Sequence, residues 1–186
     1  MNAAPFLSGQ FLLAMPGMGD PRFDQAVIAM CSHDEKGALG VAIGSALPDI
    51  SLFSLLDQFE IDREGISDAP IHWGGPVEPT RGFVLHSKDW GGQGTLSVAD
   101  RWCLSSSIDV LKVLGRANGP SRWLLALGYA GWGAGQLEGE LTRHGWHVAT
   151  SDFDALHAKP AAERWSAAFR LDGIDPRLLS AESGHA

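Results

Sequence analysis

Short apolar runs alternate with polar, glycine-rich or proline-rich breaks along most of the chain. Apolar runs of this length, bounded by turn residues, are typical of buried β-strands. The runs that predict strands are Gln10 to Met15, Ala26 to Cys31, Ala38 to Ile43, Ile71 to Trp73, Gly82 to His86, Thr95 to Val98, Trp102 to Leu104, Arg122 to Leu127 and Trp146 to Thr150. The polar segment 32–37 separates two of these runs and predicts a hairpin.

A helical spacing of apolar residues appears in fewer places. Between Ser51 and Phe59 the leucines recur at helical intervals after a serine that can cap the helix. Further helices are predicted after Ser106 or Ser107, from Gln136 to His144 and from Pro160 onward, and Asp20-Pro21 predicts a single helical turn. Groups of short strands separated by single helices favour an α+β fold.

The chain shows no repeat, low-complexity tract or linker. We therefore expect a single domain over residues 9–180 with flexible ends at 1–8 and 181–186. A chain of 186 residues can bury a core of this kind without a metal or disulfides.

The net charge of −8 narrows the range of partners. Lysine and arginine are scattered singly along the chain, which disfavours direct DNA binding and binding to anionic membranes. The two cysteines fit a reducing compartment, and the apolar patch near the N-terminus is too short for a signal peptide or a membrane span. We therefore expect a cytoplasmic protein that acts on an unidentified protein or small ligand, and its oligomeric state is not predicted.

The segment from Leu127 to Leu141, LGYAGWGAGQLEGEL, predicts a strand followed by a glycine loop and a helix. Glycines adopt positive φ and allow close backbone approach, while a helix start offers unpaired N–H groups. The loop can therefore cradle an anion, or it can let aromatic residues pack closely. It has neither the ending of a P-loop nor the spacing of a dinucleotide-binding motif, so we expect no nucleotide cofactor.

Several separated motifs resemble one known family in matching order. They are DPRFDQAV and GALGVAIG in the first quarter, HWGGPV at His72 to Val77, RGFVLH at Arg81 to His86, and GYAGWGAGQLEGEL. Together they resemble the YqgE/AlgH family of small bacterial proteins over essentially residues 9–180.

That resemblance implies a bifurcated, mainly antiparallel sheet that forms a pseudo-barrel with flanking helices. It implies little about activity, because the family has no established reaction and its label as a putative transcriptional regulator rests on a link to exopolysaccharide gene control. The chain departs from the family pattern at Gly44, where Asn is common, and at Ser32, where Glu is common.

Reactive side chains give weaker signals. Cys31 precedes His33, and a nearby imidazolium lowers a thiol pKa, so Cys31 is a candidate redox sensor; it can equally be a small buried hydrophobe. The histidines at 33, 144 and 147 lack the spacing of a zinc motif, so no metal is expected. Ser105 to Ser107 lie where a helix cap is expected and lack a nucleophile signature.

Aromatic residues beside glycine turns suggest a binding groove, although core packing also explains them. The candidate ligand-binding residues are His72, Trp73, Gly74, Gly75, Gly131, Trp132, Gly133, Gln136 and Glu138. We expect a non-enzymatic binding or regulatory protein with no catalytic residue. The alternatives are a hydrolase-like enzyme that pairs His72 or His86 with Glu138, and redox sensing through Cys31.

Overall fold

The computed structural model describes residues 6–179, so most of the two expected flexible ends, 1–8 and 181–186, lies outside the described residues. Within 6–179 the strands are β1 (Phe11–Ala14), β2 (Val27–Asp34), β3 (Gly37–Ala42), β4 (Ala46–Ser51), β5 (Pro70–Trp73), β6 (Val77–His86), β7 (Leu96–Val98), β8 (Trp102–Ser105), β9 (Trp123–Gly133) and β10 (Trp146–Ala149). The helices there are α1 (Leu52–Gln58), α2 (Ile108–Gly115), α3 (Gln136–Thr142), α4 (Phe153–His157) and α5 (Ala161–Leu171), with short 3-10 turns at Pro21–Phe23 and Pro176–Leu178.

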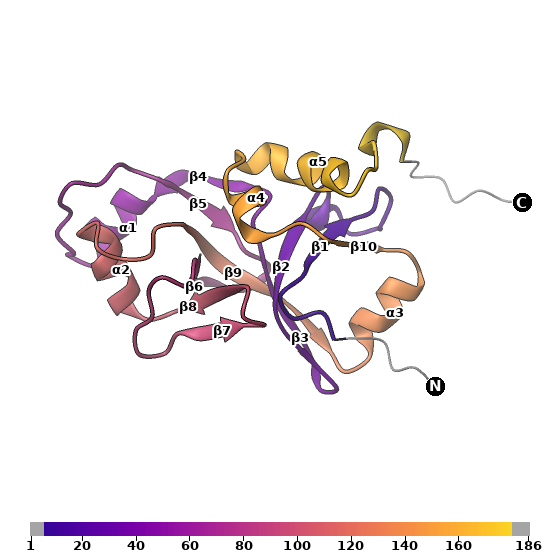
Figure 1. Cartoon of the computed structure of the whole chain (residues 1–186), viewed down its shortest axis with the longest axis horizontal. Helices are drawn as coiled ribbons and strands as arrows, with labels where there is room; N and C mark the ends of the chain where they lie inside the picture. The colour runs from indigo at the N-terminus through magenta and orange to yellow at the C-terminus, as the bar shows by residue number, and fades with distance from the viewer. Residues whose placement is uncertain (1–5, 180–186) are drawn as a thin grey trace, which may run out of the picture.

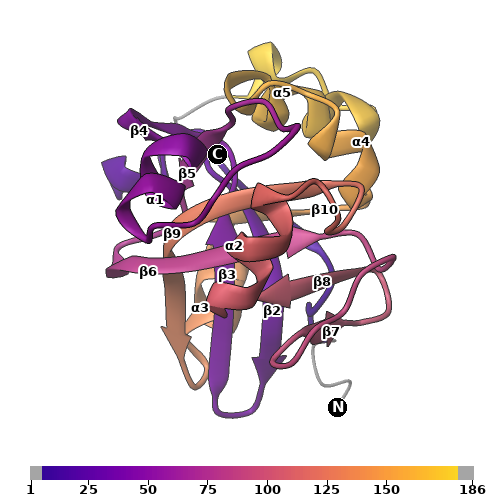
Figure 2. The same cartoon turned by 90° about the vertical axis from the view of Figure 1, so that its left-hand side faces the viewer.

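Strand β9 is the element on which the sheet divides. Its first half lies between β5, which is parallel to it, and β6, which is antiparallel; its second half pairs with β3. One branch continues as β3-β2-β1-β10 and the other as β6-β8-β7, and β4 extends β5. Figure 2 shows β2 and β3 running across the direction of β6 and β8. The expected α+β fold with a bifurcated, mainly antiparallel sheet is confirmed.

Three apolar cores lie on the faces of this sheet. The side chains of β2 alternate between two of them, with Val27 and Ala29 in the core under α4 and α5, and Ile28 and Met30 in the core under α3. This burial on both faces explains the continuous apolar run that predicted the strand. The third core lies under α1 and α2, at the opposite end of β9 from α3 (Figure 1).

Two of the predicted caps are present, whereas Ser107 precedes α2 without a side-chain cap. Ser51 and Ser54 form a reciprocal capping box at the start of α1, where the Ser51 N–H donates to Ser54 Oγ at 2.8 Å. Asp20 caps the turn at Pro21–Phe23 as predicted. None of the helices within residues 6–179 is long and apolar enough to cross a membrane.

Some element predictions were wrong. The stretch expected to be a glycine loop is strand as far as Gly133, and the hairpin after β2 turns through Glu35 and Lys36 alone. Strand β6 starts at Val77, earlier than predicted, although it contains Pro79. Its pairing with β9 is interrupted between Val77 and Gly82, so the proline removes no hydrogen bond between the two strands. Strand β4 and helix α4 were not predicted.

Candidate functional site

Gly74 and Gly75, in the bend between β5 and β6, lie directly against Gly128 and Tyr129 of β9, and no space is left between them. A Cβ on Gly74 would overlap the backbone of Gly128, and one on Gly75 would overlap the backbone of Tyr129. Gly75 also has φ +148, and Gly128 has φ +78. These glycines therefore allow β9 and the β5–β6 bend to touch backbone to backbone. Gly74 and Gly75 line neither of the two cavities described below.

His72 is a buried structural residue. Its Nδ1 lies 2.9 Å from the carbonyl oxygen of Leu125, which can only accept, so Nδ1 carries the proton. Its Nε2 then accepts from the Arg164 guanidinium at 2.7 Å. Burial lowers the pKa of His72 to about 4, so the ring is neutral at pH 7. The side chain links α5 to the sheet and is 1% exposed.

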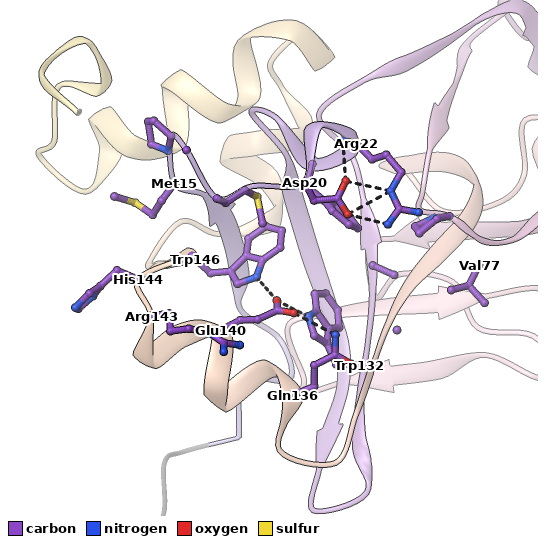
Figure 3. Close-up of a pocket in the computed structure, with 18 residues that line it drawn as sticks. Met15, Asp20, Arg22, Val77, Trp132, Gln136, Glu140, Arg143, His144 and Trp146 are labelled. Carbon is purple, nitrogen blue, oxygen red and sulfur yellow. Dashed lines mark hydrogen bonds and ion pairs between the residues drawn. The ribbon is translucent and has the colours of Figure 1, made fainter. Parts of the chain in front are cut away.

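A cavity of about 790 Å³ lies further along β9, in the region shown in Figure 3. We call it the aromatic cleft. Its walls come from the loop after β1, the start of β6, the end of β9, helix α3 and the start of β10. The lining residues are Met15, Pro16, Gly17, Met18, Asp20, Arg22, Phe23, Pro76, Val77, Ala130, Gly131, Trp132, Gln136, Glu140, Arg143, His144, Gly145 and Trp146.

Three predicted residues, Gly131, Trp132 and Gln136, line this cleft, and the other six do not. Trp73 lies behind its wall, with its ring centroid 5.6 Å from that of Phe23. Gly133 is exposed, and its N–H donates to the Gln136 side chain at 3.1 Å.

Glu140 on α3 fixes the aromatic wall. One carboxylate oxygen accepts from the indole N–H of Trp132 at 3.0 Å and from that of Trp146 at 2.8 Å. The other oxygen accepts from the Gln136 amide at 3.1 Å. Figure 3 shows both indoles directed toward this carboxylate. Sequence reasoning missed Glu140, although its i,i+4 spacing from Gln136 on a predicted helix puts both on one face.

Glu138 faces a different part of the molecule. It accepts from His33 Nε2 at 2.9 Å, while His33 Nδ1 accepts the backbone N–H of Leu7 at 3.1 Å. Its pKa is lowered by its own backbone N–H at the start of α3 and by the hydrogen bond from His33. The predicted pairing of Glu138 with His72 or His86 is therefore wrong, because Glu138 is held by His33.

The opposite wall of the cleft carries an ion pair. The Arg22 guanidinium lies 2.7 Å from the Asp20 carboxylate, and this hydrogen bond lowers the pKa of Asp20. Arg143 and His144 are exposed at the rim. His147 instead bonds Asp172 at 2.7 Å, and no three potential metal-ligating side chains converge anywhere in residues 6–179.

Cys31 lacks the environment of a redox sensor. The side chain is buried and its thiol donates to the carbonyl of Ala29 at 3.5 Å. Burial raises the pKa of the thiol to about 12, whereas a sensing cysteine needs an accessible thiolate. His33, which was expected to activate it, lies on the other face of β2 beyond an irregularity between Met30 and Ser32, where it bonds Leu7 and Glu138.

The chain is similar to proteins with no assigned activity. The profile of the AlgH-like family matches residues 11–177. UPF0301 proteins of Sphingopyxis alaskensis and Rhizorhabdus wittichii are 55% and 58% identical, each over 100% of both chains. The solution structure of the AlgH protein from Pseudomonas aeruginosa matches with a TM-score of 0.77 at 39% identity, over 100% of this chain and 99% of that one. A Corynebacterium diphtheriae protein matches with a TM-score of 0.75 at 21% identity, over 97% and 94%, which shows a shared fold alone.

Proposed function

Because the chain belongs to the AlgH-like family of uncharacterised bacterial proteins, which supplies no reaction, we propose a function from the aromatic cleft: it binds a small, largely apolar molecule. One observation carries this proposal. A single carboxylate, that of Glu140, holds the indoles of Trp132 and Trp146 in place beside a cavity of about 790 Å³. Pockets for small molecules commonly measure about 300–1,000 Å³.

The chemistry of the walls favours a flat apolar ligand with a polar edge. Met15, Met18 and Phe23 are half-buried along one side, and thioether side chains adapt their shape to a ligand. Gln136 and Arg143 supply polar groups on the α3 side. The rigid indole wall and the adaptable methionine wall together suit an aromatic ring better than a sugar or a phosphate.

The described lining residues favour binding over covalent chemistry. None of the lining residues is Ser, Thr, Cys or Lys, so the cleft offers no hydroxyl, thiol or amine nucleophile. Binding without reaction is therefore the role that we propose for this cleft.

In a regulatory role, ligand binding in the aromatic cleft would change the binding of a partner protein. Direct operator binding would require clustered basic residues, whereas the chain has a net charge of −8. We expect no mobility shift with duplex DNA at 150 mM salt. A shift that weakens steeply as salt rises would instead support direct DNA binding.

Binding is tested with a panel of indole, quinoline and naphthalene fragments, by thermal shift. Fragments that fit the cleft should raise the melting temperature in a concentration-dependent way. Trp132→Phe, which removes one indole N–H from Glu140, should weaken binding about tenfold. Trp123→Phe is the matched control, because Trp123 packs in the core under α1 and α2. Failure of the entire panel, or equal losses in both variants, would contradict the proposal.

A further inference from the structure

A second cavity, of about 370 Å³, lies between α1 and α2 over β6 and β9. Its walls are mainly apolar and include Leu55, Phe59, Val84, Leu111 and Leu125. It shares no lining residue with the aromatic cleft. Its size is near the lower end of the range for ligand pockets, about 300–1,000 Å³, and fits a short acyl chain.

Ser105 lines this cavity, and its hydroxyl is in contact with a buried histidine. Ser105 Oγ lies 2.9 Å from His86 Nε2, and His86 Nδ1 lies 2.9 Å from the carbonyl oxygen of Ser87. A carbonyl only accepts, so Nδ1 carries the proton and Nε2 is the acceptor. The Ser105 O–H therefore points at His86 Nε2, which is the arrangement of a serine nucleophile and its general base.

The remaining partners fix the direction of this chain of hydrogen bonds. The N–H of Gly92 donates to Thr95 Oγ1 at 3.0 Å, and Thr95 Oγ1 lies 2.9 Å from Ser105 Oγ. Because the Ser105 proton is committed to His86, the Thr95 hydroxyl donates to Ser105. Burial lowers the pKa of His86, so the ring is neutral at pH 7 and free to accept a proton.

The start of α2 forms the neighbouring wall. Ser107 precedes the helix without capping it, its own hydroxyl has no partner among the described residues, and the first turn is uncapped by side chains. Backbone N–H groups at a helix start favour negative charge, including the oxyanion that forms during acyl transfer.

We propose that Ser105 and His86 hydrolyse esters of short apolar carboxylic acids, with the acyl group held in the cavity between α1 and α2. Ser105 Oγ bonds to the carbonyl carbon of the ester while its proton moves to His86 Nε2. The ester C–O bond breaks and the leaving alcohol takes that proton. Water then attacks the acyl-serine and gives a proton to His86, which returns it to Ser105 Oγ as the acid departs. The net reaction converts ester and water to acid and alcohol.

The pair is shielded from bulk solvent. Ser105 is 1% exposed and His86 is 0% exposed, with the Trp90 ring edge-on to the imidazole at 5.4 Å. Because Ser105 has almost no surface open even to the cavity, a substrate carbonyl can contact its Oγ only after neighbouring side chains move, which favours small acyl groups over long or branched ones.

The test uses the full chain with p-nitrophenyl butyrate and, separately, an alkyl fluorophosphonate. We expect hydrolysis by the wild type, a loss of at least about 100-fold in Ser105→Ala and His86→Gln, and no loss in Ser97→Ala, a serine exposed on β7. The fluorophosphonate should modify Ser105 of the wild type, and mass spectrometry locates the modified residue. The same modification should be slower in His86→Gln.

If Ser105→Ala does not fold, modification of the wild type by the fluorophosphonate still shows whether Ser105 is the nucleophile. Absence of hydrolysis above buffer, equal hydrolysis by Ser105→Ala, or modification at a serine other than Ser105 would each overturn the proposal. Ester hydrolysis and fragment binding are separate assays on cavities that share no lining residue, so failure here and failure of ligand binding in the aromatic cleft are distinguishable.

Discussion

Acidification should destabilise the protein through His72, because this ring is neutral and buried between the Leu125 carbonyl and the Arg164 guanidinium. Its pKa is lowered from 6.5 to about 4. The unfolded chain therefore binds a proton that the folded chain does not. Stability from this group is fully present above pH 6.5 and falls as the pH drops from 6.5 toward 4.

The pKa values give the size of the effect. A shift of 2.5 pKa units from 6.5 to about 4 corresponds to about 3 kcal/mol of unfolding free energy once the pH is below 4. Between pH 7 and pH 5 the same linkage predicts a loss of about 2 kcal/mol. Because His72 is 1% exposed, solvent screening does not reduce this figure substantially.

Urea unfolding at pH 7, 6 and 5 measures the loss. The control is His72→Gln, whose side-chain amide can accept from Arg164 but does not titrate. Both chains share His86 and His157, whose pKa values are also lowered by burial, so the difference between their pH profiles isolates His72. The difference should be about 2 kcal/mol across this range. Parallel profiles would show that His72 is accessible and protonated in the folded protein, which would restore it as a candidate for the ligand site.

Three further predictions concern packing and the thiol. Gly75→Ala should destabilise the protein by at least about 3 kcal/mol in a urea titration, because the φ of +148 and the Tyr129 backbone leave no place for a Cβ. The control Gly131→Ala should change stability by less than about 1 kcal/mol, because a Cβ there would meet only the Tyr129 side chain at 3.5 Å. Arg164→Ala should cost about 3 kcal/mol by chemical denaturation, because it removes the donor from two buried carbonyls. Cys31 should react with a disulfide reagent at pH 8 only as fast as the chain unfolds, followed by absorbance; rapid modification of the native protein would contradict its burial.

Local patterns predicted most strands and helices because each is buried on a definite face. The apolar run of β2 and the leucine spacing of α1 report that burial directly. The bifurcation at β9 came only from the family resemblance, since no local pattern reveals that one strand pairs with three others. The family profile and the match to the Pseudomonas aeruginosa AlgH structure confirm that resemblance.

The candidate site was harder to predict. Glycine content indicated close approach correctly, yet at Gly74 and Gly75 the approaching group is the protein's own backbone rather than a ligand. Trp132 was found because it stands beside glycines, whereas Trp146 lies on another strand and meets it through a T-shaped ring contact, with centroids 6.1 Å apart, and through the shared Glu140 carboxylate. The contact between Ser105 and His86 likewise depends on strand register between β6 and β8, which sequence spacing does not give.

Fluorine NMR of the protein labelled with 5-fluorotryptophan tests the aromatic cleft most directly. Titration with the fragments that raise the melting temperature should shift the resonances of Trp132 and Trp146 together, because one carboxylate holds both rings. The resonance of Trp123, in the core under α1 and α2, should stay unchanged. Saturable shifts confined to the first two residues are the result that we predict. Shifts at Trp123 with none at Trp132 or Trp146 would contradict a binding role for this cleft.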